Sequence, residues 1–233
     1  MLIYGFQKLT LLDFPGKTAC TIFTGGCDFR CPFCHNASLV LGDGEKPEDE
    51  EVILQFLKER FGRLTGLAIT GGEPLMQPDI ADFIEKVRAI GYSVKLDTNG
   101  SFPEKLRSLI ESGLVDYVAM DIKNCRERYA ETCGLPVSAS EGLLSNIDES
   151  ISILRTSGIK YEFRTTVVKE LHTARDIESM GRWMAGDEDF YLQCFKDSGD
   201  IIRPGLSAWS ADEMKSLCEI FSKYVPRAKL RGI

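Results

Sequence analysis

The chain has 233 residues, which is enough for one large domain or two small ones with a proper core. Hydrophobic residues make up 43% and charged residues 27%, a composition that excludes a disordered or fibrous protein. The formal net charge is −7, which argues against binding to nucleic acid, because such binding depends on neutralising phosphates. We see no apolar run long enough to span a membrane and no secretory signal in the first residues, so we expect a cytoplasmic protein.

Short apolar runs alternate with stretches of helical periodicity along the chain. The runs predict strands at 20–24, 67–70, 92–97, 116–120, 160–168 and 189–195, each as short as a buried parallel strand. The stretches with helical periodicity predict helices at 48–61, 78–91, 103–112, 141–158, 173–185 and 210–224. Strands and helices in alternation predict an α/β fold with parallel strands and right-handed crossovers.

The spacing of the strands limits the architecture. They begin about every 34 residues, so a complete eight-unit barrel would need about 270 residues, more than the chain has. A partial (β/α)6 barrel or an open doubly wound sheet fits the length. In either fold, ligands bind at the carboxyl ends of the strands.

Glycine and polar residues gather where four of the predicted strands end. The four segments are Gly25-Gly26-Cys27, Gly71-Gly72-Glu73, Asp97-Thr98-Asn99-Gly100 and Asp121-Ile122-Lys123. Because the carboxyl ends of parallel strands share one edge of a sheet, these segments predict a functional site there.

Three of the eight cysteines, Cys27, Cys31 and Cys34, are bunched directly after the first predicted strand. In a chain without a signal peptide, such a group indicates a metal or redox site rather than a disulfide scaffold. Structural zinc sites need a fourth ligand, yet the chain has no second Cys-x2-Cys pair, and the neighbouring His35 is badly placed. The spacing therefore favours a [4Fe-4S] cluster with one open iron over zinc, and both over a buried trio without a metal.

The spacing Cys27-x3-Cys31-x2-Cys34, with Phe33 before the last cysteine, resembles the hallmark of the radical S-adenosylmethionine (SAM) enzymes. Gly71-Gly72-Glu73-Pro74 is similar to the Gly-Gly-Glu motif of the same family. The resemblance implies a [4Fe-4S] cluster whose open iron binds S-adenosyl-L-methionine and whose electron cleaves it to methionine and a 5′-deoxyadenosyl radical. It also implies a single radical SAM domain over 1–233, with a partial (β/α)6 barrel core at about 17–196. An extension at 1–16 would precede this core, and a C-terminal helix and tail at 197–233 would follow it.

A narrower resemblance covers roughly residues 3–195. The segments 5–8, 12–17 and 25–36 are similar to glycyl-radical-enzyme activating enzymes, above all to the anaerobic ribonucleoside-triphosphate reductase activating proteins, and so are 97–100, 120–123 and 163–167. This implies that the radical removes a hydrogen from a glycine of a partner enzyme, with a flavodoxin or ferredoxin as electron donor. Two alternatives stay open. One is a radical SAM enzyme for a small molecule or for another glycyl radical enzyme, such as a formate-lyase-like protein; the other is a non-catalytic zinc or iron–sulfur module.

The resemblance also implies roles for residues that hold the cofactor. The metal ligands would be Cys27, Cys31 and Cys34, and the cofactor would contact Phe33, Asn36, Gly71, Gly72, Glu73, Asp97, Thr98 and Asp121. Glycines without a Cβ allow a close backbone approach, and Glu73 or a carbonyl beside it can accept from the ammonium group of the cofactor. Asp97 and Thr98 match a pair associated with a monovalent cation.

Three further residues would take part in the reaction: Asp13 near the incoming glycine loop, and Lys123 and Arg164 near cofactor and substrate. Each also has a structural alternative. Asp13 could form a turn, and Lys123 and Arg164 could pair with carboxylates.

The chain departs from the family at Lys196, where some activating enzymes carry a histidine. We expect His172 at the surface or at a helix cap rather than as a ligand. We also expect Cys125, Cys133 and Cys194 to be thiols of the core or of loops rather than ligands of an auxiliary cluster.

Overall fold

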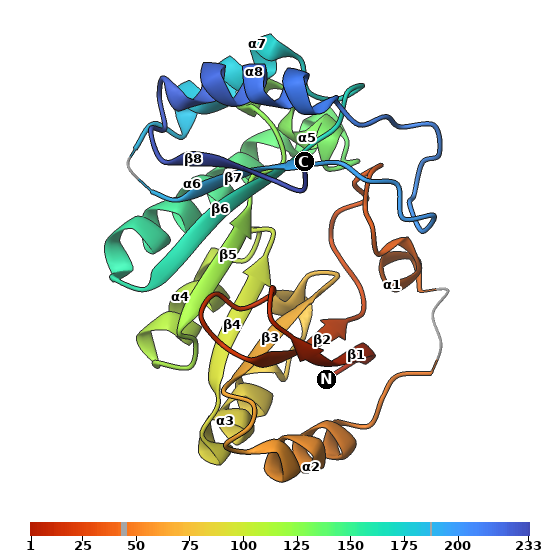
Figure 1. Ribbon diagram of the computed structural model, residues 1–233, viewed down its shortest axis with the longest axis vertical. Helices are drawn as coiled ribbons and strands as arrows, with labels where there is room; N and C mark the ends of the chain where they lie inside the picture. The colour runs from red at the N-terminus through yellow and green to blue at the C-terminus, as the bar shows by residue number, and fades with distance from the viewer. Residues whose placement is uncertain (43–45, 187) are drawn as a thin grey trace. The chain divides into compact units, whose positions relative to one another are not determined.

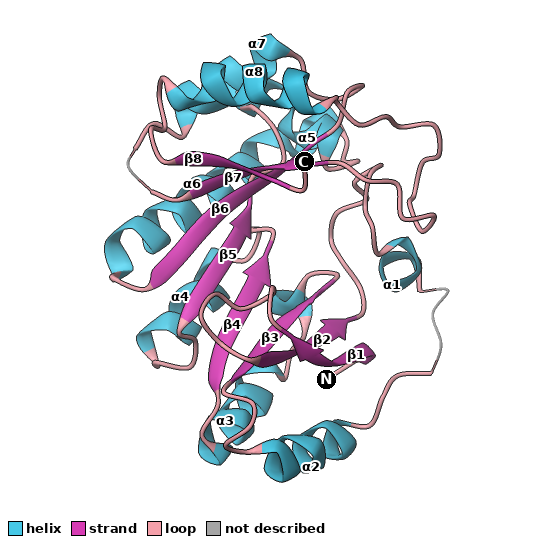
Figure 2. Ribbon diagram, in the orientation of Figure 1, coloured by secondary structure: helices cyan, strands magenta, loops and turns pink. Residues whose placement is uncertain are grey.

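The computed structural model describes residues 1–42, 46–186 and 188–233. In these residues eight strands follow one another through one sheet in chain order, and helices alternate with them (Figures 1 and 2). The strands are β1 (Ile3–Thr10), β2 (Ala19–Thr24), β3 (Gly66–Gly71), β4 (Ser93–Thr98), β5 (Tyr117–Asp121), β6 (Lys160–Val167), β7 (Phe190–Cys194) and β8 (Ala228–Arg231). The main helices are α2 (Glu50–Arg60), α3 (Ile80–Ile90), α4 (Pro103–Glu111), α6 (Ser140–Ser157), α7 (Ala174–Trp183) and α8 (Ala211–Ser222).

All six predicted strands and all six predicted helices are confirmed within a few residues of their expected bounds. The sequence missed β1 and β8, as well as the short helices α1 (Ala37–Leu41) and α5 (Tyr129–Thr132). β1 lies inside the expected N-terminal extension and pairs antiparallel with β2, while β8 lies in the expected C-terminal tail and pairs parallel with β7. β8 has only four residues, too few for an alternating pattern to mark it as a strand.

The chain divides into two compact units. The first comprises 1–28, 38–119 and 149–160, and the second comprises 29–37, 120–148 and 161–233. β5 and α6 contribute residues to both units. Among the predicted site residues, Cys27 belongs to the first unit, whereas Cys31 and Cys34 belong to the second.

The first unit contains β1 to β4, of which β2, β3 and β4 are parallel. The two faces of these parallel strands differ sharply. One face carries a register row that is fully buried and apolar: Cys20, Leu67 and Val94. The next row in register lies on the other face and is small or polar: Thr21, Ala68 and Lys95. Alternation along each strand thus separates an apolar face from a polar one.

The helices of the first unit begin and end where the sequence predicts. In α3 the apolar stripe is buried: Ile80, Phe83, Ile84 and Val87. Each such side chain contributes about 1.5–3 kcal/mol when it leaves water. The helix ends at Gly91, whose φ of 109° lies in the left-handed region that favours glycine.

The second unit contains the parallel strands β6, β7 and β8 with α7 and α8. Its core includes aromatic rings in tilted contact, with 6.1 Å between the ring centroids of Phe163 and Phe190 and 4.6 Å between those of Phe190 and Phe221. Both helices begin with a reciprocal capping box, formed in α7 by Thr173 and Asp176 and in α8 by a serine and a glutamate. In the part of the chain that the structure describes, no helix is long and apolar enough to cross a bilayer.

Candidate active site

The glycines after β2 and β3 hold two strand ends together. The Gly72 N–H donates to the Thr24 carbonyl at 2.8 Å, and the Glu73 N–H donates to the Gly26 carbonyl at 2.8 Å. A Cβ on Gly72 would collide with the Gly26 carbonyl oxygen, and Gly71 has a φ of 115°, which side chains rarely adopt. The Gly-Gly pair is therefore required by close backbone packing inside the protein.

Glu73 joins this loop to the end of β4. Its side chain is fully buried and accepts hydrogen bonds from Thr98 Oγ1 at 2.8 Å, from the Asn99 N–H at 2.6 Å and from the Leu75 N–H at 3.0 Å. Burial raises the pKa of Glu73 to about 7, and the three hydrogen bonds oppose only part of this effect. Both carboxylate oxygens are thus engaged within the protein, which favours a backbone carbonyl of this loop as the acceptor for a ligand's ammonium group.

Asn99 lies beside Cys27, although the sequence does not single it out as a site residue. Its side-chain amide donates to Asp28 Oδ1 at 2.8 Å and lies 3.8 Å from Cys27 Sγ. Its own oxygen accepts from the Ser101 N–H at 2.9 Å, which fixes the orientation of the amide. The sequence does place Asn99 in the polar strand-end segment 97–100, but only the tertiary structure shows that its amide lies beside Cys27.

Asp97 and Thr98 have different partners, because adjacent side chains of a strand point to opposite faces. Asp97 pairs with Lys95, two residues earlier on β4. Thr98 Oγ1 donates to Glu73 and accepts from the Gly100 N–H at 3.1 Å.

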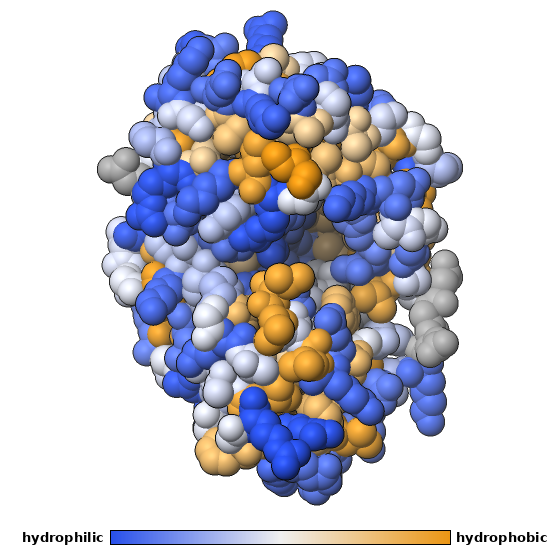
Figure 3. Space-filling model, viewed as in Figure 1, coloured by the Kyte–Doolittle hydropathy of each residue, from blue (hydrophilic) through white to orange (hydrophobic). Residues whose placement is uncertain are grey.

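Asp13 lies on the loop between β1 and β2, and its Oδ2 accepts from Thr21 Oγ1 at 2.6 Å. The same loop exposes two large apolar side chains, Leu11 and Leu12, the latter 90% exposed. Figure 3 shows that hydrophobic residues reach the surface on the face where Figure 1 draws this loop. The Asp13 N–H also donates to Thr10 Oγ1 at 3.2 Å, so both the backbone and the side chain of Asp13 are held beside an exposed apolar segment.

Asp121, Lys123 and Arg164 come together in the second unit. Lys123 Nζ donates to Asp121 Oδ2 at 2.9 Å, and Arg164 Nε donates to Asp121 Oδ1 at 2.8 Å. Burial alone would raise the pKa of Asp121, but the charges of Arg164 and Lys123 lower it below its ordinary value. Burial likewise works against a charged Lys123, yet Asp121 raises the pKa of this ammonium. Lys123 and Arg164 thus share the carboxylate of Asp121 as a hydrogen-bond acceptor.

Cys31 and Cys34 flank a tight turn in which the Cys34 N–H donates to the Cys31 carbonyl at 3.0 Å. A hydrogen bond with the Cys133 thiol lowers the pKa of Cys31, although burial opposes this effect. Burial raises the pKa of Cys34, and the Asn36 N–H partly offsets that effect. Cys133 is fully buried, and its carbonyl accepts from the Arg30 N–H at 2.8 Å, which holds residue 133 against the cysteine loop.

Phe33 is buried with its ring edge-on to His172, at 6.3 Å between centroids. The expectation that His172 lies at the surface is wrong, because this side chain is fully buried. Its Nδ1 accepts from the Val168 N–H at 3.1 Å, so the proton lies on Nε2, which donates to the Lys123 carbonyl at 2.8 Å. Burial lowers the pKa of His172 and keeps the ring neutral. The histidine thus links the backbone of Lys123 to the ring of Phe33.

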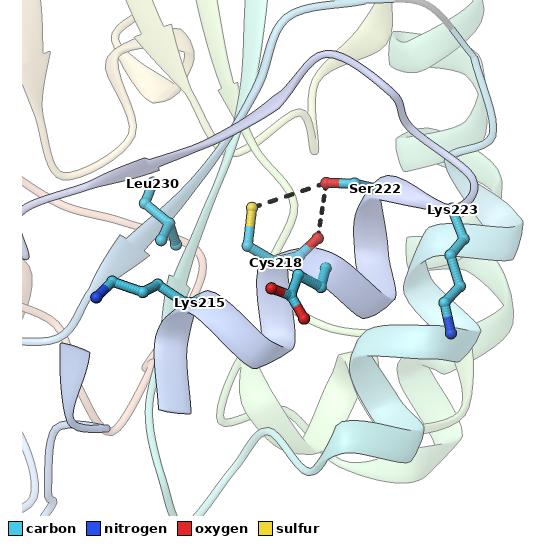
Figure 4. Close-up of a pocket in the computed structure, with 6 residues that line it drawn as sticks. Lys215, Cys218, Ser222, Lys223 and Leu230 are labelled. Atoms are coloured by element: carbon cyan, nitrogen blue, oxygen red, sulfur yellow. Dashed lines mark hydrogen bonds between the residues drawn. The ribbon is translucent and has the colours of Figure 1, made fainter. Parts of the chain in front are cut away.

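The other cysteines lie in separate surroundings. Cys125 Sγ lies 3.7 Å from Asp176 Oδ1, and Cys194 Sγ lies 3.6 Å from the Trp209 carbonyl oxygen. Cys218 is part of a surface pocket over α8 and β8, where its sulfur lies 3.8 Å from Ser222 Oγ (Figure 4). The pocket is lined by Lys215, Cys218, Glu219, Ser222, Lys223 and Leu230, none of which is predicted for the site. All eight cysteines lie in the described part of the chain, and none of them forms a disulfide.

A comparison with known families matches residues 21–183, more than half of the chain, to the radical SAM superfamily. The chain belongs to the radical SAM superfamily. The protein named "Putative glycyl-radical enzyme activating enzyme MJ1227" from Methanocaldococcus jannaschii is 30% identical over 235 residues, which cover 100% of this chain and 96% of that protein. The pyruvate formate-lyase-activating enzyme of Clostridium pasteurianum is 25% identical over 179 residues, which cover 75% of this chain and 71% of that enzyme.

The backbone is also similar to that of a radical SAM methyltransferase from Sphaerobacter thermophilus. The TM-score is 0.72 at 14% identity, with 94% of this chain and 67% of that chain covered. At this identity the likeness shows the fold alone, and it confirms the predicted α/β partial-barrel class with mostly parallel strands. As a radical SAM enzyme, the protein uses a [4Fe-4S] cluster and S-adenosyl-L-methionine.

The donor set fits such a cluster in its chemistry. Three thiols on one short loop are the ligand type that iron–sulfur clusters require. Asn99, Cys133 and the Asn36 N–H offer polar contacts to the sulfurs of Cys27, Cys31 and Cys34 respectively. Contacts of this kind orient ligands and adjust the properties of the metal. Among the described residues, no group of three or more His, Cys, Asp or Glu side chains is arranged so that it could hold a metal ion.

Proposed function

We propose that this radical SAM enzyme activates a glycyl radical enzyme, and that its partner is an anaerobic ribonucleoside-triphosphate reductase. The observation that carries the proposal is the end-to-end similarity to a protein named as a glycyl-radical enzyme activating enzyme, which leaves no large segment of either chain unmatched. The sequence resemblance favours the reductase among the possible partners. A flavodoxin or ferredoxin would supply the electron.

The cluster would be held by Cys27, Cys31 and Cys34. This cluster would supply the one electron that cleaves SAM to methionine and a 5′-deoxyadenosyl radical, and hydrogen abstraction from a glycine Cα of the partner would then give 5′-deoxyadenosine and a glycyl radical. The protein supplies binding, orientation and protection from water, as is usual for cofactor chemistry.

Residues of the first unit would bind the amino group of the cofactor. The strand ends that contain Gly71, Gly72 and Glu73 are fixed by backbone hydrogen bonds, so a carbonyl of this loop can be held in place for an ammonium donor. Glu73 supports this loop through its three hydrogen bonds and would act as a positioning residue.

Residues of the second unit would bind negative or carbonyl oxygen atoms. The cationic side chains of Lys123 and Arg164, held by Asp121, suit a carboxylate of the cofactor or a peptide carbonyl of the substrate. Phe33 and Asn36 would complete the contacts to the cofactor beside the cysteine loop.

The partner's glycine-bearing segment would approach the loop that contains Asp13. A carboxylate anchored by Thr21 can accept a backbone N–H of an incoming peptide, and exposed Leu11 and Leu12 offer apolar contact next to it.

The test is an anaerobic mixing experiment. The reconstituted and dithionite-reduced protein is mixed with SAM and, separately, with an anaerobic ribonucleotide reductase or a pyruvate formate-lyase. We expect the doublet of a glycyl radical in electron paramagnetic resonance (EPR) spectra of the reductase sample, together with 5′-deoxyadenosine. A radical in the lyase alone would refute the choice of partner. Formation of 5′-deoxyadenosine with no radical in either protein would refute both of these partners.

Variants test the ligand assignment separately. Replacing Cys27, Cys31 or Cys34 by Ala should abolish cluster assembly or SAM cleavage. Cys218→Ala is the matched control, because this thiol lies in the unrelated pocket of α8, and it should retain full iron content. Zinc in place of iron in the wild type would refute the enzymatic function.

A further inference from the structure

A surface pocket of the first unit lies where β1 ends and where β2 and β3 begin. It has a volume of about 340 Å³, and its apolar lining comes from Leu9, Phe56 and Leu64. The ring of Phe56 is held by Phe6, which lies edge-on to it at 4.9 Å between centroids. The polar lining consists of three cations and a threonine: Lys8, Arg60, Arg63 and Thr18. The pocket thus combines apolar contact with positive charge.

The three cations of this pocket are not neutralised by neighbouring carboxylates. Lys8, Arg60 and Arg63 are exposed, and among the residues that the structure describes none of them forms an ion pair. Arg60 lies over the ring of Phe56, at 5.5 Å from its centroid. Four cations elsewhere in the same unit do pair with carboxylates: Lys86, Arg88, Lys95 and Arg107. In a chain with a net charge of −7, the pocket is therefore a local region of positive potential.

Exposed leucines continue this surface beyond the pocket. Leu9, which lines the pocket, is 57% exposed, and Leu11 and Leu12 follow it at 71% and 90%. Large apolar side chains that are exposed together, with polar residues around them, are typical of an interaction site. We call the combination the basic surface, and it consists of Lys8, Leu9, Leu11, Leu12, Arg60 and Arg63.

We infer that the basic surface docks an acidic segment of the glycyl radical enzyme, with one apolar side chain of that segment in the pocket. The inference rests on the proposed function. An apolar anchor in a pocket, with complementary charges around it, is a common arrangement in protein interfaces. Because this chain is negative overall, an acidic partner is repelled by most of its surface and attracted here, so the charges also select the orientation of docking.

This contact is separate from the one that delivers the glycine. The pocket lies at the amino ends of β2 and β3, since Thr18 directly precedes β2 and Leu64 closely precedes β3. The Gly-Gly-Glu segment lies at the carboxyl end of β3, and a strand of six residues spans roughly 20 Å. The acidic segment therefore binds the body of the partner without touching the cofactor.

The test measures binding by biolayer interferometry between the cofactor-free protein and an anaerobic ribonucleotide reductase or a pyruvate formate-lyase. We expect the wild type to bind one of these enzymes, with an affinity that falls as the NaCl concentration rises. Arg63→Glu and Lys8→Glu should each weaken this binding by about tenfold. Neither variant breaks an ion pair of the described chain, so both should keep the melting temperature of the wild type.

Lys58→Glu is the matched control. Lys58 is exposed and lies on α2, but it does not line the pocket. It is two residues from Arg60, which places it on the other side of the helix. The substitution makes the same change in charge and should alter the affinity by less than about twofold.

Two results would overturn the inference. One is an equal affinity of Arg63→Glu, Lys8→Glu and the wild type for the enzyme that binds. The other is dimerisation of the wild type in sedimentation velocity that Arg63→Glu abolishes, because the surface would then contact a second copy of this chain.

The glycyl radical signal in EPR spectra tests the proposed function separately, because the binding experiment contains no cofactor. A radical in the partner together with unchanged affinities would support the proposed function and overturn the docking surface. Charge-dependent binding without a radical would support the docking surface and contradict the proposed function. A wild type that binds neither enzyme would overturn the docking surface whatever the EPR result.

Discussion

Glu73→Gln tests whether ionising the buried carboxyl that links β3 to β4 lowers the free energy of unfolding. The substitution keeps the shape of the side chain and removes its titration. In the wild type, burial raises the pKa of Glu73 from its ordinary value of 4.5 to about 7. Between these values the folded protein holds a proton that the unfolded chain has released, so the stability of the wild type falls as the pH rises. Over this window the loss amounts to about 3 kcal/mol, at about 1.36 kcal/mol per pH unit.

The assay is urea unfolding at pH 4.5 and at pH 7.5, followed by far-ultraviolet circular dichroism because both tryptophans lie in the second unit. The free energy of unfolding of Glu73→Gln, relative to the wild type, should rise by about 3 kcal/mol between the two pH values. Groups that titrate in both proteins cancel in this difference. An exposed glutamate of α3 provides the control, since Glu85→Gln should change stability by less than about 0.5 kcal/mol at either pH.

A difference that stays constant with pH would refute the conclusion that burial dominates at Glu73. A difference that moves in the opposite direction would mean that the hydrogen bonds from Thr98, Asn99 and Leu75 outweigh desolvation. In that case the carboxylate would be stabilised by folding.

Three further predictions follow from the site. Gly72→Ala should destabilise the protein by more than about 2 kcal/mol in urea unfolding, because its Cβ meets the Gly26 carbonyl, whereas Gly142→Ala, in open space on α6, should stabilise it by about 0.5–1 kcal/mol. His172→Ala should lower the free energy of unfolding by about 3 kcal/mol at pH 7. The wild type should lose stability as the pH falls below 6.5, because the unfolded histidine takes up a proton that the buried ring resists, and the variant should not show this loss. Unfolding followed by tryptophan fluorescence measures both proteins, and an equal dependence of stability on pH would contradict the prediction. Cys133→Ala should make the reduction potential of the reconstituted cluster more negative, because a hydrogen bond to a ligand sulfur is lost, while Cys125→Ala should leave the potential unchanged in a redox titration.

The sequence by itself determined the order and type of the main elements. Hydrophobic periodicity distinguishes strands from helices, and residues such as Gly91 and Thr173 mark helix ends through local backbone chemistry. It also identified the cysteine loop and the Gly-Gly-Glu segment, since a motif of fixed spacing is a property of the chain alone. The sequence did not predict short edge strands such as β8, because four residues are too few to show an alternating hydrophobic pattern.

Only the tertiary structure decided how the side chains at the strand ends are used. Glu73 supports the loop from inside, His172 is buried rather than exposed, Cys133 lies against Cys31, and Lys95 pairs with Asp97. Each of these pairs joins residues whose partnership depends on strand register or on packing between elements. Periodicity reports which face of an element a residue occupies, but it does not report which distant side chain meets that face. Hydrogen bonds and charges act over a few ångströms, so their partners are set by the folded arrangement and not by the local sequence.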